Sequence, residues 1–298
     1  MTEGTHLPGL EGNNPLGFLA ALGVQEALHI QDLDVRLWWT NELIPTAVVD
    51  VPLDRLVECI STALQGWSKH RSLNPHISSK DSSAKFSPPD IRQYLKVTQD
   101  QKIGSSLATA LISEASIDNK GVAKPSDLYF TAGRLLFVKI ARTLLASLDE
   151  DDIESALLGP WKERSTSSLG WDTSYIPYSR APTKPGAGDK SAYPGPEALA
   201  VLGMSRHPVF TGNKRTLTQG CSGTWQHTLY TWPLWHHPSG YGTVRSLLAQ
   251  ARHPEIDERH SRLYKGWGIL LICQSEISRN RGQGGGMFGP PRILWSDY

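Results

Sequence analysis

The sequence has few of the residues that build metal centres or disulfide frameworks. Its only three cysteines, Cys59, Cys221 and Cys273, lie far apart and form no Cys-x-x-Cys pair. Isolated cysteines in odd number build neither a disulfide framework nor a zinc–thiolate site. No two histidines have the His-x-x-x-His spacing of a helical metal site. We therefore expect no bound metal and no cofactor.

Long apolar runs and catalytic signatures are also lacking. No stretch of ~18 apolar residues occurs, which predicts that no helix spans a membrane. Residues 1–6 lack the basic and apolar pattern of a secretory signal, so we expect a cytoplasmic protein. Nothing resembles a Gly-x-Ser-x-Gly elbow, a Walker loop or the surroundings of a catalytic cysteine. The sequence thus predicts a protein that is not an enzyme.

Net charge is nearly absent overall, but it is unevenly distributed. The 298 residues carry 30 Lys and Arg against 29 Asp and Glu. Residues 203–298 hold 11 of the basic and 5 of the acidic residues, a balance of +6, which leaves −5 for residues 1–202. A near-neutral chain does not bind nucleic acid through its overall field. A basic last third is typical of a subunit that contacts a phosphate backbone locally.

The stretch Leu7-Pro-Gly-Leu-Glu-Gly-Asn-Asn-Pro-Leu-Gly-Phe-Leu-Ala-Ala-Leu-Gly23 predicts a loop that leads into a helix. Asn14 suits the N-cap, where its side chain accepts hydrogen bonds from first-turn amides, and Pro15 suits the first helical position. Gly17 and Gly23 lower helix propensity, so we expect another backbone or a ligand to approach closely there.

Hydrophobic periodicity along the rest of the chain predicts an α+β fold. The first two-thirds are mostly helical with short strands, and the last third is mixed α/β. Further helices are expected at 52–67, 89–98, 105–116, 127–148, 150–158 (capped by Asp149), 196–204 and 243–252, and strands at 35–39, 47–51, 207–211, 225–232 and 268–273.

Proline and glycine divide the chain into three predicted parts. Residues 172–196 contain five prolines from Pro177 to Pro196 together with several glycines, which favours a linker or loop. Residues 1–171 then form a helix-rich region with short strands, and residues 197–298 form the basic mixed α/β region. A glycine loop is expected over 279–289.

Candidate nucleic-acid-binding residues lie mainly in three basic loops. Arginine neutralises phosphate, while Asn and Gln side chains hydrogen-bond base edges. The third loop, residues 70–85, includes Lys80 and Lys85, and the two asparagines before the first helix are further candidates. The predicted contacts are Arg279, Asn280, Arg281 and Gln283 in the glycine loop, Lys214 and Arg215 in a second turn, and Asn13 and Asn14.

Two alternatives remain open. A metal-dependent nuclease or hydrolase would use His227, His236, His237 and Asp172, although adjacent histidines of an extended chain point to opposite faces. A scaffold subunit of another assembly would place some of the ten tryptophans at interfaces. Trp171, Trp232 and Trp235 stand in apolar contexts, which favours core or interface packing.

Five motifs occur in a fixed order between about residues 7 and 250. They are Gly12-x-Asn-Pro-Leu-Gly-Phe-Leu-Ala-Ala-Leu-Gly23, Phe130-Thr-Ala-Gly-Arg-Leu135, Leu157-Leu-Gly-Pro-Trp161 with Leu169-Gly-Trp-Asp172, Ala198-Leu-Ala-x-Leu-Gly203 with Pro208-Val-Phe210, and Trp232-Pro-Leu-Trp235 with Val244-Arg-Ser-Leu-Leu248. In this order they resemble the large-subunit family of type I CRISPR effector (Cascade) complexes, subtype G (formerly U). Gly170 stands where the family usually has arginine.

The resemblance implies a non-catalytic subunit of a guide-RNA surveillance complex for antiviral defence. Its expected partners are the backbone and guide-processing subunits, the guide RNA, the target double-stranded DNA and a helicase-nuclease. The subunit would read the motif that flanks the target (PAM), aid R-loop formation and recruit the helicase-nuclease. Such complexes delegate sequence matching to base pairing, so the protein needs few base contacts.

Overall fold

The computed structural model describes residues 4–99, 104–131, 136–173, 191–212, 215–250, 256–279 and 286–297. These residues fold into helices and several sheets, which confirms the predicted α+β class. The helices are α1 (Pro15–His29), α2 (Leu53–Lys69), α3 (Pro88–Gln99), α4 (Gly104–Leu111), α5 (Phe137–Ser147), α6 (Glu150–Leu158), α7 (Pro194–Met204), α8 (Tyr241–Gln250) and α9 (Glu258–Gly266), with a 3-10 turn at Asp81–Ser83. Among the described helices, none combines the length and the apolar character that crossing a bilayer requires.

The strands form two main antiparallel sheets and two short two-stranded sheets. One sheet has the order β1-β3-β2, and the larger has the order β11-β10-β9-β8 with β12 also paired to β10. β4 pairs with β5, and β6 pairs with β7. The strands are β1 (Thr5–Glu11), β2 (Leu37–Trp39), β3 (Thr46–Val49), β4 (Arg164–Ser165), β5 (Ser191–Ala192), β6 (Val209–Gly212), β7 (Arg215–Thr218), β8 (Cys221–Gly223), β9 (His227–Trp235), β10 (Ile269–Arg279), β11 (Gly286–Phe288) and β12 (Arg292–Ser296).

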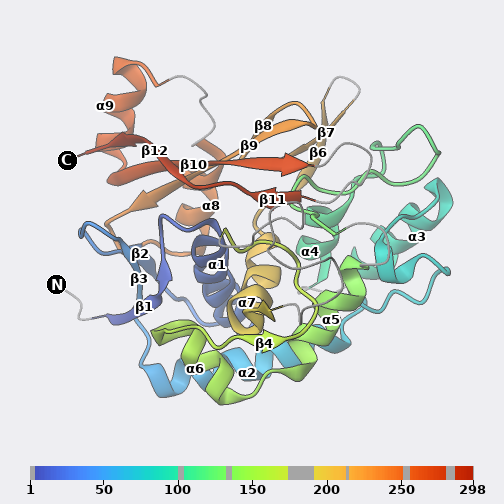
Figure 1. Cartoon of the computed structure of the whole chain (residues 1–298), viewed down its shortest axis with the longest axis horizontal. Coiled ribbons are helices and arrows are strands. Elements are labelled where there is room, and N and C mark those ends of the chain that lie inside the picture. The colour runs from blue at the N-terminus through green and yellow to red at the C-terminus, as the bar shows by residue number, and fades with distance from the viewer. Residues whose placement is uncertain are drawn as a thin grey trace, which may run out of the picture.

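The helices α1 and α7 form the centre of the molecule, between the five-stranded sheet and the helices α2, α5 and α6 (Figure 1). They cross at Gly23 and Gly203. A Cβ on Gly23 would overlap the carbonyl oxygen of Leu199, and a Cβ on Gly203 would overlap that of Leu19. The close approach expected at Gly23 is therefore a helix crossing. Through it, residues on both sides of the predicted 172–196 linker share one apolar core.

Tryptophans join segments that lie far apart in sequence. Trp171, Trp232 and Trp235 are fully buried, as their apolar contexts predicted. Their indole N–H groups donate to backbone carbonyls of other segments: Trp171 to Leu128, and the other two to residues 12 and 37, at 2.7–2.9 Å. Buried indoles need such a partner, because an unpaired buried donor costs free energy.

Two predicted helix starts are confirmed in detail. The Asn14 side chain accepts hydrogen bonds from the amides of Leu16 and Gly17, and Pro15 is the first helical residue. Asp149 caps α6 and forms a capping box with Asp152. Each cap depends on contacts within a few residues, which is why the sequence sufficed.

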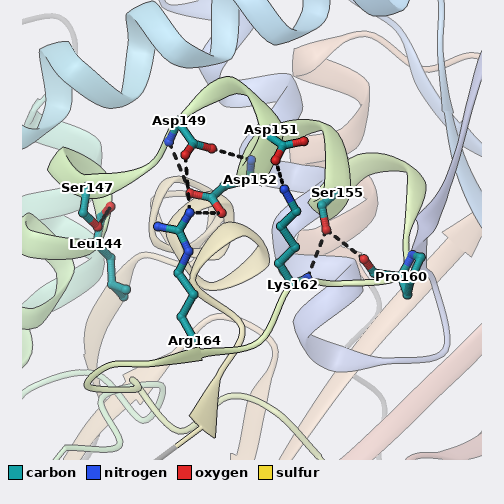
Figure 2. A network of polar contacts seen from close by, with 9 residues as sticks. All are labelled: Leu144, Ser147, Asp149, Asp151, Asp152, Ser155, Pro160, Lys162 and Arg164. Carbon is teal, nitrogen blue, oxygen red and sulfur yellow. Dashed lines mark hydrogen bonds and ion pairs between the residues drawn. The ribbon is translucent and has the colours of Figure 1, made fainter.

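Ion pairs hold the chain after α6 against that helix (Figure 2). Arg164 lies 2.6 Å from the buried carboxylate of Asp152. Lys162 pairs with the exposed Asp151, and the Ser155 hydroxyl donates to the carbonyl of residue 160 at 2.8 Å. The segment that leads to β4 is thereby tied back along α6.

Several sequence expectations were wrong. The loop expected before α1 is strand β1, which pairs with β3. Residues 127–131 are not helical, because tertiary partners occupy their backbone: the Asp127 amide donates to Thr218 and the carbonyl of Leu128 accepts from Trp171. Part of the expected glycine loop is strand β11, paired with β10.

Other boundaries also differ. Helix α7 begins at Pro194, since proline is compatible with a first helical turn. Strand β9 begins at His227, which leaves Trp225 in a hairpin turn. Helix α9 and strand β12 were not predicted.

Candidate nucleic-acid interface

The connection of residues 112–131, after α4, is contacted by all three of the predicted basic segments. One of these segments is the hairpin of strands β6 and β7, which flank the second predicted basic turn. In β7 the Thr216 hydroxyl donates to the carbonyl of Lys124 at 3.5 Å. The Thr218 hydroxyl accepts from the amide of Asp127 at 2.7 Å. These bonds fix the hairpin against the connection.

The other two basic segments reach the same connection. The amide of Ala123 donates to the carbonyl of Phe86 at 2.7 Å, which brings the exposed Lys85 end of the 70–85 loop beside it. At the end of β10, Arg279 donates to the carbonyl of Asp127. Three segments that lie far apart in the sequence thus meet around one connection.

Arg279 is held by the protein itself. Its Nη1 donates to the Trp225 carbonyl at 3.1 Å and to the Thr228 hydroxyl at 2.9 Å, while Nη2 donates to Asp127. The guanidinium carbon lies 4.0 Å from the centroid of the Trp225 ring. Burial lowers the pKa of Arg279, and nearby Asp127 and Cys221 oppose that shift. Its first role in this arrangement is therefore to fix the indole.

Trp225 lies in an exposed hairpin tip, residues 223–227, between β8 and β9. The Lys124 ammonium lies 5.3 Å from its ring centroid, within the range of a cation–π contact. Two backbone hydrogen bonds close the tip. The Thr224 amide donates to the His227 carbonyl at 3.1 Å, and the His227 amide donates to the Thr224 carbonyl at 3.2 Å. Gly223 has φ +87°, and a Cβ there would overlap the carbonyl of His227.

Two acidic side chains beside these segments have basic partners. Glu114 forms an exposed pair with Arg92 at 3.5 Å. Glu276 lies 3.1 Å from Nδ1 of His227. Pairing of this kind reduces the repulsion that a bound phosphate would feel from an isolated carboxylate.

The remaining predicted contacts are distributed as follows. Arg215 is the first residue of β7, opposite Gly212. Asn14 is occupied as the cap of α1, and Asn13 precedes it in a turn whose Gly12 carbonyl accepts from Trp232 in mid-β9. The turn at Asn13 therefore lies beside the middle of β9 and away from the hairpin tip of residues 223–227. Asn280, Arg281, Gln283 and Lys214 lie outside the described residues.

The histidines of the alternative metal site are not brought together. His227 begins β9, whereas His236 and His237 follow its other end, roughly 30 Å away at strand rise. The rings of His236 and His237 lie 3.7 Å apart. Burial and the neighbouring His237 lower the pKa of His236. Within the described residues, no three His, Cys, Asp or Glu side chains gather as a metal site would require.

The motif Leu169-Gly-Trp-Asp172 is anchored by a buried carboxyl group. Glu197, in α7, accepts from the Leu169 amide at 3.0 Å and from the Ser168 hydroxyl at 2.5 Å. Burial raises the pKa of Glu197 to about 7, against these hydrogen bonds. The following Asp172 adds to that rise.

Sequence reasoning missed Trp225 and Lys124 as members of this site. Gly223 at a turn position was the available signal for the hairpin tip, but the cation–tryptophan contacts join residues about 50 and 100 positions apart. No known family matches the chain, and no curated protein is similar to it in sequence.

Proposed function

We propose that this chain is the non-catalytic large subunit of a type I, subtype G-like CRISPR guide-RNA surveillance complex. The observation that carries the proposal is the convergence of the three predicted basic segments on residues 112–131. A subunit that holds DNA beside a target needs several phosphate contacts on one face, and separate loops supply them only if the fold brings them together. The choice of this family in the proposal rests on the order of the five motifs described above.

The resemblance motifs have a structural role consistent with this reading. Leu19 to Gly23 and Leu199 to Gly203 make the helix crossing, and Trp171, Trp232 and Trp235 are in the core. These motifs stabilise the fold. The basic loops, which lie outside the motifs, form the candidate interface. In the proposed complex the interface contacts the duplex beside the target, reads the flanking motif and aids R-loop opening.

The partners follow from the same proposal. Backbone and guide-processing subunits hold the guide RNA, base pairing with it reads the target, and this chain recruits the helicase-nuclease once the duplex opens. The chain itself cleaves nothing in this scheme and acts in the cytoplasm.

Co-expression tests the proposal. The chain is produced with tagged backbone subunits and guide RNA, and we expect it to co-purify in fixed stoichiometry and to increase affinity for a target duplex with the correct flanking motif. Recovery of the chain as a lone monomer in the presence of all partners would contradict the proposal. Metal-dependent cleavage by the purified chain, abolished by His236→Ala, would contradict its non-catalytic part.

A further inference from the structure

The hairpin tip at Trp225 has an aromatic surface that the fold does not use. Trp225 remains 36% exposed, although five other tryptophans are fully buried. Every residue from Gly223 to His227 is exposed. The exposed part of the Trp225 side chain therefore lies at the surface, where a ligand can reach it.

The indole is nevertheless held firmly. Arg279 donates hydrogen bonds to its backbone carbonyl and to Thr228, and the guanidinium stacks on the ring. The Thr228 hydroxyl in turn donates to the carbonyl of Thr224 at 2.8 Å. An exposed side chain fixed in this way loses little conformational entropy when a ligand binds.

The chemistry beside the indole is cationic and polar. Lys124 places an ammonium within 5.3 Å of the ring centroid, and Gln226 extends the exposed tip by one amide. The tip adjoins the end of β10, where the guanidinium of Arg279 lies 4.0 Å from the centroid of the Trp225 ring. An aromatic face next to ammonium and guanidinium groups matches a base joined to its phosphates.

We propose that Trp225 and Lys124 bind single-stranded nucleic acid, with Trp225 stacking on an unpaired base and Lys124 contacting the adjacent phosphate. Bases inside a duplex are already stacked on one another, so an indole on a hairpin tip reaches a base face only where the strand is unpaired. Base–aromatic stacking accepts any base and is worth ~1–3 kcal/mol per base. The inference rests on the proposed nucleic-acid role of this end of the sheet.

Binding by the purified full-length chain tests the inference. The probes are fluorescein-labelled oligonucleotides of about 12 nucleotides, oligo(dT) and oligo(U), and a duplex of the same length, measured by anisotropy at low salt. Trp225→Ala should weaken single-strand binding by about 5- to 150-fold, the equivalent of one lost stack. Trp225→Phe should retain most of the affinity, because the ring remains.

Trp267→Ala is the matched control. Trp267 is 38% exposed but precedes the opposite end of β10 from Arg279. The Trp267→Ala variant should bind both single strands with the affinity of the parent chain. Lys124→Gln should weaken binding of the single strand and reduce its salt dependence by about one released ion. A preference between oligo(dT) and oligo(U) identifies the strand type, and either preference, or none, supports the inference.

Three results would overturn it. They are failure of the parent chain to bind either single strand, equal losses for Trp225→Ala and Trp267→Ala, and an equal effect of Trp225→Ala on the duplex. Unchanged thermal unfolding of each variant rules out misfolding. If Trp225→Ala does not fold, Lys124→Gln keeps the test valid, because unchanged single-strand affinity and salt dependence in that variant would overturn the inference. Co-purification is measured separately: a chain that binds single strands through Trp225 but joins no complex retains this inference and loses the proposed function.

Discussion

The carboxylate of Glu26 and the guanidinium of Arg206 form an ion pair in the interior, where α1 meets the residues after α7. Arg206 Nε lies 3.6 Å from Glu26 Oε2, and both side chains are almost completely buried. The guanidinium also stacks on Tyr241 at 3.4 Å and donates to Gln25 at 2.6 Å. Burial raises the pKa of Glu26 and lowers that of Arg206, each against the attraction of the other.

Arg206→Ala should therefore destabilise the protein strongly, by about 3–5 kcal/mol, because it leaves the Glu26 carboxylate buried without its cation. The double variant Glu26→Gln/Arg206→Met should recover part of that loss, since it buries no charge. Urea unfolding of the parent, single and double variants measures both. Equal stability of the single and double variants would show that the loss comes from packing rather than from the unpaired charge.

Glu197 should make stability depend on pH. Its pKa is about 7 in the folded protein and lies near 4.5 in the unfolded chain, so the folded state binds the proton more tightly. Its contribution is complete below about pH 4.5 and is lost as pH rises towards 7, a change of roughly 3 kcal/mol. The measurement is the difference in unfolding free energy between the parent and Glu197→Gln from pH 4.5 to 8. A constant difference across this range would contradict the assignment.

The two ion pairs of Arg164 and the one of Lys162, all beside α6, should differ in strength. Asp152 has a side chain only 1% exposed, whereas that of Asp151 is 77% exposed. Arg164→Ala removes the cation from the buried carboxylate and should cost about 1–3 kcal/mol. Lys162→Ala serves as the control and should cost less than ~1 kcal/mol, because solvent screens an exposed pair. Thermal unfolding of the two variants compares them, and a reversed order would refute the argument from burial.

In the proposed complex, the two kinds of predicted DNA contact should be separable. Arg281→Ala should weaken binding equally on targets with correct and incorrect flanking motifs, because phosphate contacts carry no sequence information. Gln283→Ala should instead reduce discrimination between them by ~1–3 kcal/mol while leaving non-specific affinity nearly unchanged. Target binding measured on both DNAs distinguishes the two. If neither variant changes binding, the reader lies in residues 70–85 or at Asn13 and Asn14.

Features determined by neighbouring residues could be predicted from the sequence. The cap at Asn14 and the capping role of Asp149 depend on contacts within three residues, so their patterns sufficed. Strand β1 could not be predicted, because its partner β3 lies about 40 residues away. Helix α9 is strongly polar, and Tyr264 is its one buried residue, so a search for apolar residues at helical spacing missed it.

The candidate site was predictable only as separate loops. Their positions along the chain were visible, but the bonds that unite them, such as Arg279 to Asp127, join residues 152 positions apart. The same kind of bond displaced the first residues, 127–131, of the helix expected at 127–148. Residues whose backbone groups form hydrogen bonds with distant partners depart from their local helix or strand propensity. A single sequence does not show which distant residues those partners are.

The crossing of Gly23 with Gly203 also constrains the order in which the chain matures. Helix α1 is buried on nearly all sides, with 14 of its 15 residues inaccessible in the finished fold. Its principal partner, α7, emerges from the ribosome about 180 residues later, which is roughly 10–40 s at usual rates of synthesis. Throughout that interval α1, one of the most apolar segments of the protein, lacks the helix against which it packs in the finished fold. Helix α1 can therefore reach its final packing only after α7 has been synthesised.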